Sequence, residues 1–181
     1  YGYGVPRDWF TAIKWYKKAA SKNHAEAMSS LGDCYNEGRG VKQNRAEAMK
    51  WYLKGARYGD IDAMVAVGAR YGNGDGVKKN PKEAFKWFSK AANEGDAGGQ
   101  FNLCIMYYKG EGVKKDYYKA FEMCKKSAEQ GKADAQYRLS FMYSLGEGVD
   151  KPDLEQGTAW LKKAADQGNE EAINLLNTLA K

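Results

Sequence analysis

Histidine, proline and long apolar runs are scarce in this sequence. Its 181 residues include one histidine, His24, and three prolines. A histidine metal site or cysteine–histidine catalysis would have to depend on His24 alone, so neither is expected. No run approaches the roughly 18 apolar residues that span a bilayer, and the first residues do not have the layout of a secretory signal. No membrane segment is therefore predicted, and we expect any signal to lie upstream.

Cysteine is also sparse, and its spacing does not indicate a zinc site or a disulfide framework. Cys34, Cys104 and Cys124 form no Cys-x-x-Cys pair, and any disulfide scheme leaves one of them unpaired. Cys104 and Cys124 stand at core positions of helical patterns, where cysteines are commonly small buried packing residues. A disulfide between these two is the alternative.

The composition that is present favours a soluble helical chain. Hydrophobic residues make up 43% of the sequence, enough for a packed core, and 13 Tyr and 5 Trp accompany 21 Gly. The formal charge of +6 arises from 29 basic and 23 acidic residues spread along the chain. Because no segment gathers this charge, no nucleic-acid-binding arm is predicted.

A fixed period of 36 residues is the strongest signal in the sequence. A Gly-Val pair begins at Gly4, Gly40, Gly76, Gly112 and Gly148. Before each pair from the second onward, apolar or small residues recur at steps of four, one and three, which places them on one helix face. These predicted core positions are Ala27, Leu31, Gly32 and Tyr35; Ala63, Val67, Gly68 and Tyr71; Gly99, Leu103, Cys104 and Tyr107; and Ala135, Leu139, Ser140 and Tyr143.

A second helical pattern follows each Gly-Val pair. Its tryptophans, Trp15, Trp51, Trp87 and Trp160, are predicted to fill the gaps between neighbouring helix pairs. The last copy is displaced by one residue, which we assign to the turn at residues 150–153. Glycines before each valine end the first helix, because glycine adopts positive φ without steric strain.

The alternation of these two helices resembles the Sel1-like repeat family, a relative of the tetratricopeptide repeats. The shared residues are the Ala, Leu-Gly, Tyr, Gly-x-Gly-Val, Ala, Trp and Ala-Ala positions, and they cover essentially the whole chain. Local departures are Cys104 and Ser140 at the first-helix glycine and Met123-Cys124 at the Trp-Tyr pair. The resemblance implies an all-α fold: a right-handed α-solenoid of antiparallel helix pairs with a 36-residue repeat and a C-terminal capping helix.

We expect one solenoid over residues 1–181. Its predicted parts are a partial repeat at 1–24, full repeats at 25–60, 61–96, 97–132 and 133–169, and a capping helix at 170–181. Asn174 and Asn177 predict the cap, because they place polar groups where a further repeat would need apolar ones.

The resemblance also implies where a partner binds, because first helices line the concave surface of tetratricopeptide-like solenoids. Large apolar residues at these positions commonly mark protein interaction sites. The predicted groove residues are Asp33, Glu37, Val65, Phe101, Ile105, Tyr108, Tyr137, Phe141 and Leu145. The alternative is that Phe101 and Tyr137 are buried against the next repeat.

The charges suggest different roles for the two sets of helices. The acidic residues Glu26, Asp33, Glu37 and Asp62 are candidates to hold a basic segment of a partner, or else are solvated carboxylates. Lysines of the second helices, Lys17 and Lys54 among them, are expected to keep the convex face soluble.

By resemblance, the chain is expected to be a scaffold that binds a protein or peptide in its groove. It is not expected to be an enzyme or to bind a cofactor, a metal or nucleic acid. One alternative is an immunity protein that neutralises a secreted toxic effector such as a phospholipase, and a remoter one is a β-lactamase-like hydrolase. A bacterial protein in the periplasm or outside the cell is favoured over a cytoplasmic one.

Overall fold

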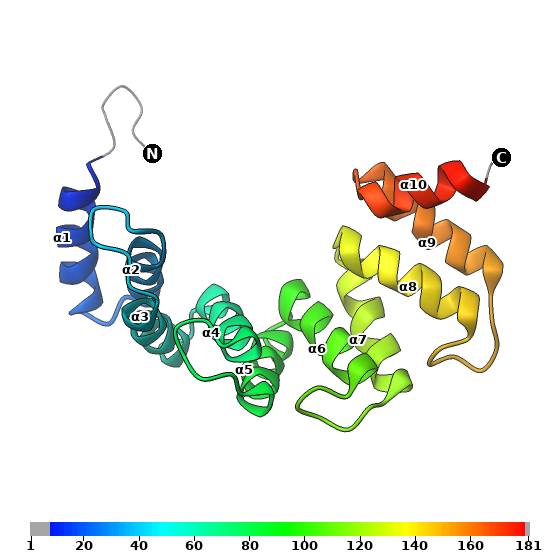
Figure 1. The fold of residues 1–181 in the computed structure, drawn as a ribbon, viewed down its shortest axis with the longest axis horizontal. Helices are drawn as coiled ribbons and strands as arrows, with labels where there is room; N and C mark the ends of the chain where they lie inside the picture. Colours follow the sequence, from blue (N-terminus) through cyan, green and yellow to red (C-terminus); the bar gives the residue numbers. More distant parts are fainter. Residues whose placement is uncertain (1–7, 180–181) are drawn as a thin grey trace. The chain divides into compact units, whose positions relative to one another are not determined.

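The computed structural model describes residues 8–179, and within them it contains ten α-helices and no strand (Figure 1). The chain divides into two compact units, Tyr1–Trp87 and Phe88–Lys181, with the division inside the fifth helix. The helices are α1 (Trp9–Ala20), α2 (Ala25–Glu37), α3 (Arg45–Arg57), α4 (Ile61–Asn73), α5 (Pro81–Asn93), α6 (Ala97–Lys109), α7 (Tyr117–Glu129), α8 (Ala133–Leu145), α9 (Leu154–Asp166) and α10 (Glu170–Leu179).

Polar caps and glycines set the ends of these helices. The Asp60 and Asp96 side chains accept hydrogen bonds from the backbone N–H groups of Ala63 and Gly99 and begin α4 and α6. Four first helices end at a glycine with φ between 73° and 79°, a left-handed conformation that glycine adopts without strain. The glycines predicted to end the first helices are therefore found at those ends, while Gly4 and Val5 lie outside the described residues.

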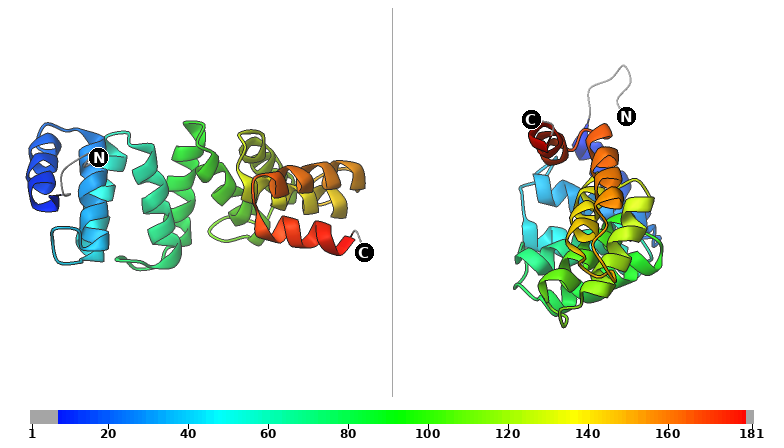
Figure 2. Two further views of the ribbon diagram at one scale, coloured as in Figure 1. Left: turned by 90° about the horizontal axis from the view of Figure 1, so that it is seen from above. Right: turned by 90° about the vertical axis from the view of Figure 1, so that its right-hand side faces the viewer.

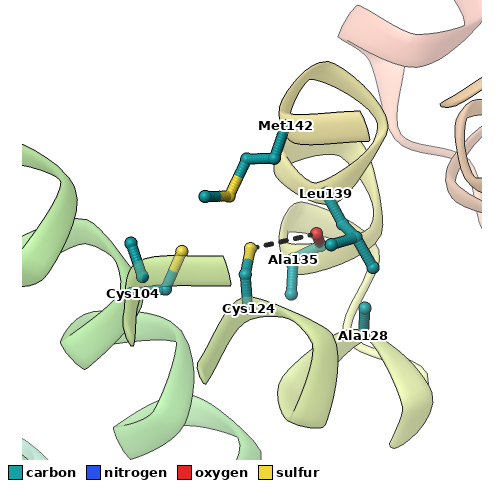
Figure 3. Close-up of a cluster of buried hydrophobic side chains, with 7 residues drawn as sticks. Cys104, Cys124, Ala128, Ala135, Leu139 and Met142 are labelled. Carbon is teal, nitrogen blue, oxygen red and sulfur yellow. Dashed lines mark hydrogen bonds between the residues drawn. The ribbon is translucent and has the colours of Figure 1, made fainter. Parts of the chain in front are cut away.

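Within each unit, consecutive helices pack against each other and bury the periodic residues. In unit 1, α2 packs on α3 and α3 on α4, and Leu31 and Val67 have no exposed surface. In unit 2, α6 packs on α7, α7 on α8 and α8 on α9, around Cys104, Cys124 and Met142 (Figure 3). These residues are the ones that the helical pattern predicts to be buried, apart from Met142.

The two cysteines of unit 2 are free thiols on facing helices. Both are fully buried, and the Cys124 thiol donates a 3.5 Å hydrogen bond to the Ala135 carbonyl (Figure 3). Contact with the Cys104 thiol, together with burial, raises the pKa of Cys124 above its ordinary value. The pair is thus a small buried packing element in this structure.

Cys104 and Cys124 depart from the repeat motif together, because the sizes of the facing residues on the two helices of one repeat compensate for each other. In unit 1, α2 carries Gly32 and α3 carries Tyr52, and a Cβ atom on Gly32 would lie 2.7 Å from the Tyr52 ring. In unit 2 the corresponding residues are Cys104 and Cys124. A larger residue on the first helix is thus accompanied by a smaller one on the second.

The capping helix α10 packs on α9 (Figure 2). It buries Ala172 in a cluster with Leu161 and Ala164, while Asn174 and Asn177 are exposed as predicted. Residues 180 and 181 of the predicted cap lie outside the described residues.

The prediction that every repeat tryptophan fills a gap is wrong for Trp15. Its side chain is 62% exposed, whereas Trp87 is buried and Trp51 and Trp160 are half-buried. The sequence pattern is the same at all four positions, but no helix precedes α1 in the described residues to cover Trp15.

The contact between α2 and α3 can be tested by Gly32→Ala. Because the added Cβ has no room beside Tyr52, we expect the substitution to destabilise the protein by roughly 1–3 kcal/mol, seen as a lower midpoint in urea unfolding. In a double-mutant cycle with Tyr52→Leu, the effect of Gly32→Ala should fall, because the smaller side chain makes room. Additive effects would show that this contact does not limit the packing.

Candidate partner-binding face

In unit 1 the first helices α2 and α4 flank a groove of about 230 Å³. It has four carboxylates, two serine hydroxyls and the Tyr52 ring among its lining groups. The lining includes Asp33, a predicted groove residue, together with Glu26 and Asp62, which were candidates to hold a basic segment of a partner. The lining consists of Glu26, Ser29, Ser30, Asp33, Tyr52, Asp60, Asp62, Ala63 and Ala66.

The groove is acidic, and its carboxylates have no ion-pair partner in the part of the chain that the structure describes. None of the four carboxylates forms an ion pair within residues 8–179. Asp33 accepts a 2.6 Å hydrogen bond from the Tyr52 hydroxyl, and Asp60 caps α4. Burial and the bond to Asp33 raise the pKa of Tyr52, so its hydroxyl remains a donor over the usual pH range.

A buried arginine supports the groove from the core side, and the sequence analysis missed it. Arg70 of α4 is 7% exposed, and its guanidinium lies 4.9 Å from the centre of the Tyr52 ring. It donates to Asp75 at 2.6 Å and to the Asn36 side-chain oxygen at 2.7 Å. Arg70 therefore connects Tyr52 to the loop after α4 and to the end of α2.

The burial of Arg70 could have been predicted from its position in the 36-residue period. Cys34, Met106 and Met142 occupy the same position in the other three first helices, and all are buried. An arginine among buried cysteine and methionine residues indicates a charge that needs internal partners. Its partners could not be identified from the repeat pattern, because Asn36 and Asp75 are not shared by the other repeats.

The other two predicted groove residues of unit 1 are not among the groove's lining residues. Glu37 forms an ion pair with Arg39 at the end of α2. Val65 is half-buried on α4. The structure thus brings Asp33, but not Glu37 or Val65, to the acidic groove.

In unit 2 the predicted residues lie on α6 and α8 and are exposed to different extents. Leu145 is 63% exposed, whereas the other five are half-buried. Tyr137 and Phe141 pack edge to face with their ring centres 5.0 Å apart. The face is therefore apolar, with Leu145 as its most accessible predicted residue.

Phe101 and Tyr137 both make core contacts. Phe101 packs against the cluster around Cys104, and the Lys132 ammonium lies 5.6 Å from its ring centre. Tyr137 packs against the cluster of Leu161, Ala164 and Ala172. Substitutions at these two residues would therefore disturb packing as well as any surface that they present.

Tyr108 is held by polar contacts within unit 2. Its hydroxyl donates a 3.0 Å hydrogen bond to Glu147, and the Arg138 guanidinium lies 4.9 Å from its ring centre. Burial, followed by the bond to Glu147, raises the pKa of Tyr108. Its orientation is thus fixed by the loop that follows α8.

The remaining reactive groups do not assemble into a catalytic arrangement in the described part of the chain. His24 is an exposed N-cap residue without a side-chain capping bond, and the three cysteines are buried. Residues 8–179 contain no group of three or more metal-ligating side chains placed to hold an ion. None of their helices combines the length and apolar character needed to cross a membrane.

Comparison with known proteins identifies the repeat. The family model for the Sel1 repeat matches residues 1–24, 25–60, 61–96, 97–132 and 133–169. The chain belongs to the Sel1 repeat family. The predicted all-α repeat fold is thereby confirmed, while no protein with a curated description matches the sequence.

Two solved Sel1-type structures are similar over nearly all of the chain. A Sel1 repeat protein from Oxalobacter formigenes is 39% identical, with a TM-score of 0.90, and the match covers 97% of this chain and 71% of that one. A protective antigen of uropathogenic Escherichia coli strains, which displays an SLR fold, is 36% identical with a TM-score of 0.89. That match covers 94% of this chain but only 36% of the antigen, so the chain spans about a third of its length.

A more distant relative has a described role. An immunity protein from Pseudomonas aeruginosa is 25% identical, with a TM-score of 0.58, and the match covers 93% of this chain and 62% of that one. The Sel1 fold is therefore present both in a bacterial antigen and in a bacterial immunity protein.

The role of Arg70 can be tested by two substitutions. Arg70→Ala should destabilise unit 1 by roughly 1–3 kcal/mol, because it removes the hydrogen bonds to the half-buried Asp75 and Asn36 and leaves a void beside Tyr52. Arg70→Met should be tolerated better, because methionine is the buried residue at this position in α6 and α8. Urea unfolding followed by tryptophan fluorescence measures the stability of both variants. An equal loss of stability in the two would show that methionine cannot replace Arg70 in the way that Met106 and Met142 fill the same position.

Proposed function

We propose that this Sel1 repeat chain is a scaffold that binds a protein or peptide partner through the exposed face of its first helices. Sel1 repeat proteins generally mediate protein–protein interactions. The observation that carries the proposal for this chain is the acidic groove between α2 and α4, which is flanked by first helices and whose carboxylates form no ion pair within the described residues.

The chemistry of the groove favours a basic segment. Lysine or arginine side chains would find carboxylates that are already close together, and binding would relieve the repulsion among them. The Tyr52 ring adds a surface on which an arginine or the aliphatic part of a lysine can pack. Asp33 is held in place by Tyr52, so its carboxylate needs little ordering on binding.

The face of unit 2 favours apolar groups of a partner. Ile105, Phe141 and Leu145 lie on its first helices, and Leu145 is largely exposed. An exposed leucine beside half-buried apolar neighbours offers apolar surface that a partner can bury. Because the neighbouring side chains are already packed, little conformational entropy is lost on binding.

An immunity protein is a second candidate within the same class of function. It is supported by the likeness to the Pseudomonas aeruginosa immunity protein, which extends over 93% of this chain. The two proposals differ in their partners: a neutralising protein forms one tight one-to-one complex with a toxic effector, whereas a general scaffold binds several weaker partners.

The acidic groove can be tested by peptide display against the immobilised chain. We expect the selected peptides to be enriched in lysine and arginine and to lose at least tenfold in affinity for a Glu26→Lys, Asp62→Lys variant. Glu155→Lys, Glu171→Lys is the matched control, because both residues are exposed acids outside the groove. Selected peptides without basic residues, or equal losses in both variants, would contradict the proposal.

The apolar face of unit 2 has its own test. Leu145→Glu should weaken a partner complex by about 1–3 kcal/mol while leaving the circular dichroism spectrum unchanged, because its side chain is mostly in water. Tyr118→Glu is the control, since Tyr118 is 67% exposed on a second helix. Calorimetric titration with the partner measures both, and a greater loss from the Tyr118 variant would place the contact on the opposite helices.

A further inference from the structure

Unit 1 contains a second and larger cavity, away from the first-helix groove. It has a volume of about 720 Å³ and lies where the C-terminal ends of α1 and α3 meet the start of α2. Lys17 and Ala20 line it from α1, Met28 from α2, and Trp51, Lys54 and Arg57 from α3, with Tyr58 directly after α3. No acidic residue of the described chain takes part in the lining. Lys17 and Lys54, which were expected to keep the convex face soluble, are among these lining residues.

The corresponding places in unit 2 are bridged by pairs of glutamines. The Gln130 amide donates to the Gln100 side-chain oxygen at 2.8 Å, and the Gln167 amide donates to that of Gln136 at 2.6 Å. Each bond connects the residue after a second helix to the first helix of the same repeat.

The first full repeat of unit 1 does not have this bridge. Met28 stands at the position of Gln100 and Gln136, and Tyr58 at the position of Gln130 and Gln167. A methionine and a tyrosine cannot form the amide pair, and the Tyr58 side chain is 54% exposed. The first full repeat therefore differs at this place from the two repeats of unit 2.

One of the three cationic positions carries the opposite charge in unit 2, whereas the position of Lys54 is also lysine there, at Lys126 and Lys163. Arg57 of unit 1 corresponds to Glu129 and Asp166 of unit 2. Glu129 forms a 3.9 Å ion pair with Lys125, whereas Lys17, Lys54 and Arg57 form no ion pair within residues 8–179. Three cations therefore face one cavity without a counterion from the described chain.

The lining also offers apolar and aromatic surface. Met28 is 3% exposed, and the Lys54 ammonium lies 4.4 Å from the centre of the Trp51 ring. The Trp51 indole Nε1 is buried and has no hydrogen-bond acceptor in the part of the chain that the structure describes. The cavity thus combines three cations with an apolar and aromatic wall.

We propose that this cavity binds a small ligand in which an oxyanion, a carboxylate or a phosphate, is attached to an apolar group. The oxyanion would be bound by Lys17, Lys54 and Arg57, and the apolar group would pack against Met28 and Trp51. The volume is within the range of about 300–1,000 Å³ that is usual for small-molecule sites. This site is independent of the first-helix groove, because it attracts the opposite charge.

The test uses three probes that share one ring system: 1-naphthoate, 1-naphthyl phosphate and the neutral 1-naphthalenemethanol. The reporter is the indole N–H signal of Trp51 in the ¹H–¹⁵N spectrum of the full chain, assigned by its loss in Trp51→Phe. We expect one or both anions to shift this signal in a saturable way, at least tenfold more tightly than the neutral probe. The relative affinities of the two anions tell whether the site prefers carboxylate or phosphate.

Two variants that introduce residues of the unit 2 repeats test separately whether binding depends on the cations of the cavity or on its open space. Arg57→Glu introduces the residue of α7 and should weaken anion binding at least tenfold. Met28→Gln, Tyr58→Gln introduces the glutamine pair without changing any charge and should also abolish binding. Lys78→Glu, an exposed lysine of the loop before α5, is the control and should leave binding unchanged.

Several results would overturn the proposal. They are equal binding of the neutral probe, no binding of either anion at millimolar concentration, or unchanged binding by Arg57→Glu. The three cations would then serve only the C-terminal ends of α1 and α3, whose carbonyl groups favour positive charge. None of these results bears on the acidic groove, which is tested with basic peptides.

Discussion

The close packing of each first helix on the second helix that follows it is the contact on which the other features depend. In unit 1 this contact requires a glycine, since Tyr52 fills the space that a side chain of Gly32 would need. Once α2 and α3 are held at this distance, one face of α2 is buried and its opposite face is exposed. The left-handed glycine at the end of each first helix then allows the chain to turn and repeat the arrangement.

This repeated packing lets single substitutions create different local chemistry on one framework. In the proposals made for unit 1, carboxylates on α2 and α4 attract cations, while three cations at the ends of α1 and α3 attract an anion. The net charge of +6 describes neither place. What matters is the position of each charge within the 36-residue period, as the exchange of Arg57 for Glu129 shows.

The sequence was sufficient to predict the helices, the glycines that end the first helices and most of the core, because these depend on local spacing and on turn residues. It also placed Asp33 on the exposed side of α2, where the structure has the acidic groove. It could not identify the bonds of Arg70 to Asn36 and Asp75, or the glutamine pairs, because a repeat pattern gives a face of a helix but not the partner of each side chain on the neighbouring helices. The exposure of Trp15 was missed for the same reason: the pattern is identical at Trp51, and only the neighbouring helices differ.

The most direct test of the central claim, that the first helices form the binding surface, is amide hydrogen exchange of the chain alone and in complex with a bound basic peptide. We expect protection on binding to be concentrated in α2 and α4, with the residues near Asp33 and Asp62 among the most affected. Protection confined to α1, α3 and the loops after them would contradict it, because the partner would then occupy the second helices.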